Sequence, residues 1–270
     1  MEKLAFCFLL KSSTINNLDI WEDFFRGHED FYEIYVHAAD NQTITQKFVN
    51  DRLINEYYTT WGDIYLAVMA LYKRAVLNGC KKVILLSGCC IPVKTFPAIY
   101  SYLTNDDSSY LAYQPHLAKT ENERKTLESS LGRFLNNSYR SSDFARNIDI
   151  THWFYNETWT ILNRYHAELI LEHSWLLDQF RRMNCYAHDE NFPSYVLSLT
   201  GELKNVINKR TTFTNWRESS GDKSKRHPKN YESISSSDLE AFKPFLFARK
   251  FSFISDIVKQ LPLDSMIYTS

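Results

Sequence analysis

Strand-like and helix-like segments alternate through the first hundred residues, and this order constrains the fold more than any other feature of the chain. The strand-like runs are apolar and rich in β-branched or aromatic side chains, and they cover residues 4–10, 31–37 and 82–87. The helix-like segments carry apolar residues at helical spacing and cover residues 19–26, 61–77 and 96–103. Strands that alternate with helices predict an α/β fold with a mostly parallel, Rossmann-like sheet flanked by helices.

The rest of the chain gives weaker signals. We expect strands at residues 110–113, 148–153 and 244–251, helices at residues 158–171, 174–183 and 252–260, and irregular structure at residues 46–55. Serine capping signals mark a further helix start near residue 235. A length of 270 residues supports a substantial core, and the sequence has no internal repeat or linker. We therefore expect one domain over residues 1–270.

The charge balance and the cysteines limit the partners and the compartment. The chain has 31 basic and 32 acidic residues, so no overall field favours nucleic acid or a membrane surface. The apolar run at 4–10 ends at Lys11 without a cleavage pattern, and no later segment is apolar enough to span a bilayer. Five cysteines form no CxxC pair, which favours reduced thiols. We expect a cytoplasmic, soluble protein without a membrane span.

Ligands of parallel α/β sheets bind beyond the carboxyl ends of the strands, which here are residues 11–13, 37–40 and 87–90. These turns lack GxGxxG and the P-loop pattern, which argues against a dinucleotide fold and a P-loop NTPase. The chain also lacks a DxD motif and any His/Cys zinc spacing. We therefore expect a site that works without a metal ion.

An acidic pair, Asp189 and Glu190, precedes an apolar helical stretch in CYAHDENFPSYVLSL. Asp189 is a suitable N-cap residue, which would place Glu190 in the first turn, where the helix dipole favours the ionised form. A rigid carboxylate at such a position suits a general base. The local pattern alone, however, favours a capped helix with one more acidic residue in its first turn.

Other candidates each have a structural alternative. Arg249 and Lys250 interrupt an apolar strand, so they either face an anion or protect an edge strand from aggregation. The basic run at 223–229 resembles a nucleic-acid patch, although a solvated loop fits the neutral charge balance better. Ser87 follows a strand but lacks the GxSxG pattern of a nucleophile, which favours a structural turn. Five tryptophans have the flat surface that stacks on sugars, but we assign them to the core by default, namely Trp61, Trp153, Trp159, Trp175 and Trp216.

Several stretches in fixed order resemble the core-2/I-branching β-1,6-N-acetylglucosaminyltransferase family, especially its plant and microbial members. They are LAFCFLL, WEDFFRGHEDFYEIYVH, WGDIYLAVMALYKRAVLNGCKKVILLSGCCIPVKTFPAIYSYL, ETWTILNRYHAELIL, CYAHDENFPSYVLSL, the HP of SKRHPKNY, and FLFARKFS. WEDFFRGH, SGCCIP, the acidic pair and FARKF carry most of the specificity. The resemblance is weakest over residues 104–147. The membrane anchor, stem and luminal disulfides of the family have no counterpart here, so we expect a soluble enzyme of a microbe or a large virus.

The resemblance implies a GT-A-like fold, with residues 1–103 as the nucleotide-binding half and 104–270 as the acceptor and catalytic half. It implies inversion at the sugar carbon, no divalent metal and no cofactor besides the UDP-sugar donor. Glu190 matches the catalytic base of the family, and Lys250 matches the lysine that holds the donor diphosphate, with Arg249 beside it. A second basic residue comes from the preceding segment, where the candidates are Lys229, Arg226 and His227.

The family binds the donor uridine at the end of the second strand, which here is Val36, His37 and Ala38, with Ser87 close by. We expect Asp189 and Trp159 on the acceptor side. The implied reaction transfers a sugar, with N-acetylglucosamine expected, from UDP to a hydroxyl of a glycan or glycoprotein in β-linkage. Alternatives are UDP-xylose or UDP-glucose as donor, or a non-catalytic module that binds a nucleotide sugar or a glycan.

Overall fold

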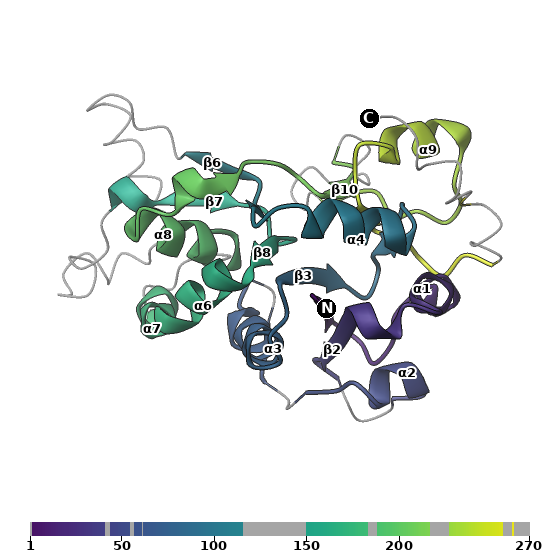
Figure 1. Ribbon diagram of the computed structural model, residues 1–270, viewed down its shortest axis with the longest axis horizontal. Coiled ribbons are helices and arrows are strands. Elements are labelled where there is room, and N and C mark those ends of the chain that lie inside the picture. The colour runs from purple at the N-terminus through teal and green to yellow at the C-terminus, as the bar shows by residue number, and fades with distance from the viewer. Residues whose placement is uncertain are drawn as a thin grey trace.

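The computed structural model describes residues 2–40, 44–54, 57–60, 62–115, 150–182, 188–216, 227–255 and 261, which Figure 1 shows as a ribbon. Its largest sheet has six strands in the order β2-β1-β3-β8-β5-β9. They are β1 (Leu4–Leu10), β2 (Tyr32–Ala38), β3 (Lys82–Ser87), β5 (Ser109–Tyr110), β8 (Ile161–Asn163) and β9 (Val206–Ile207). Neighbouring strands are parallel except where β8 takes part. The expected α/β fold with a mostly parallel sheet is confirmed, and it is GT-A-like.

Helices cover both faces of this sheet. Because successive side chains of a strand point to opposite faces, Phe6 of β1 packs in one core cluster with Trp21, whereas Cys7 packs in another with Leu71. In Figure 1, α6, α7 and α8 lie together beside α3, whereas α1, α4 and α9 lie toward the other end. The helices are α1 (Leu18–Phe25), α2 (Lys47–Asn50), α3 (Tyr65–Leu77), α4 (Phe96–Thr104), α6 (Arg164–Glu172), α7 (Trp175–Arg182), α8 (Phe192–Leu199) and α9 (Ser236–Phe242). None of the helices in the described ranges is long and apolar enough to cross a bilayer.

Two smaller sheets complete the described strands. One has the order β10-β11-β4, and the other pairs β6 with β7. Their members are β4 (Ile91–Pro92), β6 (Tyr113–Pro115), β7 (Phe154–Asn156), β10 (Thr212–Thr214) and β11 (Phe247–Arg249). Since β4 begins four residues after β3 ends, its antiparallel pairing with β11 brings the FARKF segment to the carboxyl end of β3.

The turn after β3 packs closely against the segment after β1. A Cβ atom added at Gly88 would lie 2.8 Å from Leu10 Cδ2 and 2.9 Å from the Thr14 carbonyl oxygen. The Asn16 backbone N–H also donates to the Gly88 carbonyl oxygen at 2.7 Å. Glycine is therefore needed at position 88 because the two chain segments approach too closely for any side chain.

The expectation of one helix over residues 158–171 is wrong. Residues Ile161–Asn163 form strand β8, which pairs with β3, and α6 begins only at Arg164. The side chain of Asn163 accepts from the His166 backbone N–H at 2.7 Å and so caps the new helix. The apolar residues of β8 complete the sheet, and this tertiary pairing outweighs the helical spacing of the sequence.

Other boundaries also differ. Residues 46–55 contain the short helix α2, and α3 begins at Tyr65 rather than at residue 61. Within the expected strand at 148–153, Ile150–His152 forms a 3-10 turn that β7 follows, and residues 148 and 149 lie outside the described ranges. Residues 252–254 are not helical, and residues 256–260 lie outside the described ranges. The capping signal is confirmed, since Ser235 and Asp238 form a capping box at the start of α9.

Candidate functional site

The carboxyl ends of β1, β2 and β3 meet at one edge of the large sheet, as the sequence predicts. Because β8 runs in the opposite direction, its first residue lies at this same edge, and so do Trp159 and Thr160, which precede it. The Leu85 backbone N–H donates to the Thr160 carbonyl oxygen at 3.0 Å. The segment 157–160 therefore joins the edge that the first three strands define.

The FARKF segment is fixed at this edge by backbone hydrogen bonds. The Phe251 N–H donates to the Cys89 carbonyl oxygen at 3.0 Å, and the Asn16 side-chain amide donates to the Phe251 carbonyl oxygen at 2.7 Å. The Asn17 side chain adds two hydrogen bonds: its amide nitrogen donates to the Ser252 carbonyl oxygen, and its amide oxygen accepts from the Ile254 N–H. Lys250 is thus held against the turns that follow β1 and β3, although it is far from both in the sequence.

Arg249 and Lys250 form a group of positive charges together with Lys11. Burial lowers the pKa of the Lys250 ammonium, and the nearby charges of Arg249 and, less strongly, Lys11 lower it further. The Arg249 guanidinium lies over the Trp159 ring, 4.3 Å from its centroid, and its buried Nε has no hydrogen-bond partner among the described residues. Among the described residues, neither Arg249 nor Lys250 has a carboxylate partner. Such a group is suited to bind an anion.

The second charged group is acidic and centres on Glu190. Burial raises the pKa of the Glu190 carboxyl to about 7, and the negative charges of Asp189 and Glu157 contribute to the rise. The expectation that Asp189 caps the helix is wrong, because His188–Glu190 forms a 3-10 turn and Asn191 is the N-cap of α8. The helix dipole does not keep the pKa of Glu190 low, since burial and like charges raise it. A pKa near 7 nevertheless suits a general base at neutral pH.

Polar side chains tie this acidic turn to β7. The Asn156 side-chain oxygen accepts from the Ser194 hydroxyl at 2.7 Å and from the Ser194 backbone N–H at 3.2 Å. The Asn156 amide lies 3.5 Å from the Asp189 carbonyl oxygen, and the Asn191 side-chain amide donates to the Phe154 carbonyl oxygen at 2.9 Å. These contacts between α8 and β7 hold Glu190 next to the end of β7.

Sequence reasoning missed three residues around Glu190. Arg210 forms an ion pair with Glu157, in which Arg210 Nε lies 2.9 Å from Glu157 Oε2. Burial raises the pKa of the Tyr155 phenol, and the charges of Glu190 and Glu157 raise it further. The sequence offered a weak signal for Glu157, which lies two residues before Trp159, but none for Arg210, because the ion pair joins residues 53 positions apart.

Trp159 links the acidic and the basic group. Its ring contacts Arg249, and its Cα lies at most about 7 Å from that of Glu157, since the two residues are two positions apart in the sequence. The default assignment of tryptophans to the core holds for Trp153, which is 3% exposed, but is wrong for Trp175 and Trp216, which are 57% and 44% exposed. Trp61 lies outside the described residues.

The residues expected at the uridine differ in their accessibility. The Val36 side chain is fully buried in the core, and its N–H and C=O pair with Arg52 and Ile54. The His37 ring is also buried, and its Nε2 lies 3.0 Å from both the backbone nitrogen and the carbonyl oxygen of Tyr57. Val36 therefore has no free backbone polar group, and its expected role at the uridine stays a prediction.

Ala38 ends β2 at the expected edge, and the next N–H, that of Ala39, donates to Leu10. The Ser87 hydroxyl lies 3.2 Å from Cys89 Sγ and 3.1 Å from Cys90 Sγ, inside the turn after β3. The structure therefore supports the turn interpretation of Ser87.

The basic candidates that precede FARKF in the sequence differ in their surroundings. Lys229 Nζ lies 3.8 Å from Asp238 Oδ1 and 4.8 Å from the centroid of the Tyr231 ring. The Tyr231 N–H donates to the Lys250 carbonyl oxygen at 2.8 Å, so this segment runs beside Lys250. His227 is exposed, and Arg226 lies outside the described residues. Lys229 is near the basic group, but it shares its charge with a carboxylate.

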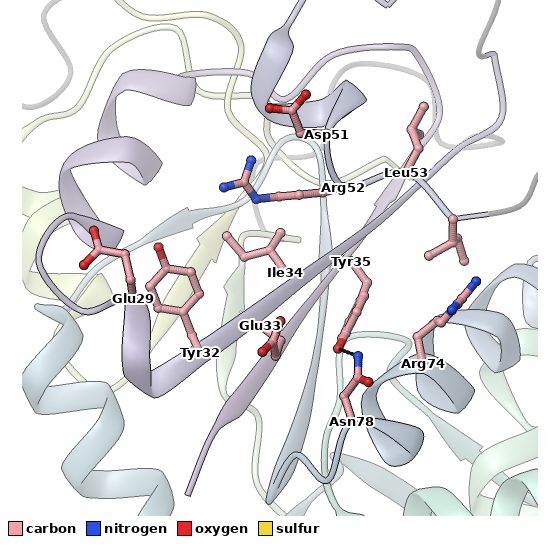
Figure 2. Close-up of a pocket in the computed structure, with 11 residues that line it drawn as sticks. Glu29, Tyr32, Glu33, Ile34, Tyr35, Asp51, Arg52, Leu53, Arg74 and Asn78 are labelled. Atoms are coloured by element: carbon pink, nitrogen blue, oxygen red, sulfur yellow. Dashed lines mark hydrogen bonds between the residues drawn. The ribbon is translucent and has the colours of Figure 1, made fainter. Parts of the chain in front are cut away.

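A cavity of about 600 Å³ lies away from both charged groups, on the outer edge of β2. Figure 2 shows that residues of β2, the segment 51–54 and α3 line it. The candidate site is formed by the charged groups rather than by this cavity, because they lie at the sheet edge where ligands of such folds bind and because perturbed pKa values are typical of functional sites.

No three His, Cys, Asp or Glu side chains in the described ranges are grouped so as to hold a metal ion.

Comparison with known proteins identifies the family of the chain. A family model described as Core-2/I-Branching enzyme matches residues 4–245. The chain is 22% identical over 192 residues to a protein of Oryza sativa subsp. japonica named Glycosyltransferase BC10, which corresponds to 67% of this chain and 43% of the rice protein. The chain thus spans less than half of that relative's length. The match over most of its residues shows that the chain belongs to the Core-2/I-Branching enzyme family.

Proposed function

We propose that the protein is an inverting glycosyltransferase that moves a sugar, N-acetylglucosamine in the first instance, from UDP to a hydroxyl of a glycan or glycoprotein. The family membership and the name of the rice relative support glycosyl transfer. The observation that carries the proposal is the pair of charged groups at one sheet edge: a basic group without a carboxylate partner among the described residues, and a carboxyl group whose pKa is about 7.

In the proposed reaction, Glu190 is the base. Its ionised carboxylate takes the proton of the acceptor hydroxyl while that oxygen forms a bond to the sugar C1. The bond between C1 and the phosphate oxygen breaks on the opposite face, and the electron pair leaves with UDP. Because the Glu190 pKa is about 7, a substantial fraction of the carboxyl groups is ionised at neutral pH and yet basic enough to accept a proton.

Lys250 and Arg249 would meet the negative charge that develops on the departing diphosphate. The buried Nε of Arg249 has no partner among the described residues and is available for this purpose, and stacking on Trp159 holds the guanidinium in place. Lys11, at the end of β1, adds a third positive charge close to Lys250. We propose that this group takes the role that a divalent ion has in other nucleotide-sugar enzymes, so that the reaction needs no metal ion.

A thermal-shift experiment in EDTA tests this proposal. The ligands are UDP, UDP-N-acetylglucosamine, UDP-xylose, UDP-glucose and GDP-mannose, and a ligand at one hundred times its Kd adds about 2.7 kcal/mol of stability. We expect full stabilisation by the uridine compounds in the wild type and in Lys204→Ala, an exposed control, and a smaller stabilisation in Lys250→Ala. Stabilisation that requires Mn²⁺ or Mg²⁺ would contradict the metal-free site, and no response to any uridine compound would contradict the donor site itself.

Transfer with each donor then distinguishes catalysis from binding alone. Glu190→Gln should bind UDP normally and lose transfer. Binding without transfer in the wild type, with a range of glycan acceptors, would favour the non-catalytic module. The donor that gives turnover would decide between N-acetylglucosamine, xylose and glucose.

A further inference from the structure

The cavity at the outer edge of β2 lies apart from the proposed transfer site. It has a volume of about 600 Å³ and is lined by the first four residues of β2, by residues 51–54, by Glu29 and by Arg74 and Asn78 near the end of α3. In Figure 2, Tyr32 and Ile34 point to one face of the strand, and Glu33 and Tyr35 point to the other. The cavity therefore follows the edge of the strand rather than one face of the sheet.

The backbone of β2 at this edge has unused hydrogen-bonding groups. The N–H of Val36 donates to the Arg52 carbonyl oxygen and its C=O accepts from Ile54, so even-numbered residues of β2 face outward, away from β1. The N–H and C=O of Ile34 must then face the cavity, and they have no partner in the described part of the chain. The segment around Leu53 acts as an edge strand beside Val36 only.

The charged side chains around the cavity differ in whether they have an ion-pair or hydrogen-bond partner. Each carboxylate already has a partner within the chain, namely Lys3 for Glu33, Lys47 for Asp51 and the Gly27 backbone for Glu29. Arg52 donates to the Phe48 carbonyl oxygen and lies over the Phe48 ring. The exposed Arg74 guanidinium has no ion pair or hydrogen bond with any residue that the structure describes. The unmet charge of the cavity is therefore positive.

We propose that this edge binds an extended acidic segment of a partner protein, which adds as a strand beside Ile34 and places a carboxylate on Arg74. An extended backbone matches the outward N–H and C=O of Ile34, as in strand addition to other sheet edges. Four residues of β2 line the cavity and span about 13 Å, so the bound segment has about four residues. The carboxylate supplies the negative charge that Arg74 lacks.

The probe is a fluorescent, N-acetylated and C-amidated peptide of sequence Val-Glu-Val-Glu-Val, titrated with the full chain by anisotropy. Two control peptides have Lys in place of Glu, or N-methyl groups on alternate backbone amides. We expect the wild-type chain to bind the Glu peptide and neither control peptide. Arg74→Gln should bind the Glu peptide at least tenfold more weakly. Bound Glu peptide should slow hydrogen exchange at the Ile34 amide of the wild-type chain. Arg164→Gln, in which the replaced guanidinium pairs with Glu168, should bind as the wild type does.

Equal binding of the Lys peptide, or of the N-methylated peptide, would overturn the proposal, because neither charge nor strand pairing would then matter. Unchanged binding by Arg74→Gln would do the same, as would displacement of the Glu peptide by millimolar inorganic phosphate, which would identify the site as a simple anion site. Arg74 is exposed on α3, so its replacement should leave the fold intact. A thermal unfolding curve checks this for each variant.

Discussion

Glu190→Gln should make the protein more stable at alkaline pH and have little effect at acidic pH. Burial and neighbouring charges raise the Glu190 pKa from 4.5 to about 7, so the folded state binds this proton more tightly than the unfolded chain does. The stability that the bound proton provides is present below pH 4.5 and is lost as the pH rises through about 7. Glutamine has a similar shape and no charge, so it does not lose this stability.

The magnitude follows from the linkage between protonation and folding. A pKa rise from 4.5 to about 7 corresponds to about 3 kcal/mol at 1.36 kcal/mol per pH unit. At pH 8.5 nearly all of this cost applies to the wild type, whereas at pH 5.0 it is less than about 1 kcal/mol because Glu190 in the folded protein is still protonated. The stability gain of Glu190→Gln should therefore grow by about 2–3 kcal/mol between pH 5.0 and pH 8.5.

Urea unfolding at the two pH values, extrapolated linearly to water, measures this difference. Glu172→Gln is the matched control, since it makes the same chemical change at an exposed position near the end of α6 and should show no growth with pH. A gain for Glu190→Gln that is equal at both pH values, or a loss at pH 8.5, would refute the argument that burial keeps Glu190 protonated. The same variant should lose sugar transfer, because its amide accepts no proton.

Three further predictions address the two charged groups and the turn after β3. Lys250→Ala should weaken UDP binding by about 1–3 kcal/mol in calorimetry, the range for a lost charge-assisted hydrogen bond, and unchanged affinity would remove Lys250 from the site. Asp189→Asn removes a negative charge near Glu190 and should therefore lower the Glu190 pKa. The acidic limb of the pH profile of kcat/KM should then move to lower pH. A limb that does not move would mean that another group controls it. Gly88→Ala should cost about 1–3 kcal/mol in urea unfolding, because its Cβ would lie 2.8 Å from Leu10 Cδ2. Wild-type stability of that variant would show that the two turns can separate freely.

The sequence determined the main architecture because its strongest signals are local. The apolar runs of β1, β2 and β3, each followed by a helical segment, are sufficient to predict a parallel sheet and the edge at which ligands bind. The acidic pair and the two cations in FARKF were visible for the same reason: charged residues beside apolar segments stand out in the sequence. The strand β8 was missed, because its partner β3 lies about 80 residues earlier and only pairing with it favours a strand over a helix.

Only the tertiary structure decided the electrostatics of the site. The raised pKa of Glu190 depends on burial, on Asp189 and on Glu157, which directly follows β7 and which the fold brings near. The lowered pKa of Lys250 depends on burial and on Arg249 and Lys11, the last of which comes from the other end of the chain. Desolvation and Coulomb interactions act through space rather than along the sequence. The residue types that carry the proposed chemistry were therefore predictable from the sequence, whereas their protonation and their partners follow from the three-dimensional fold.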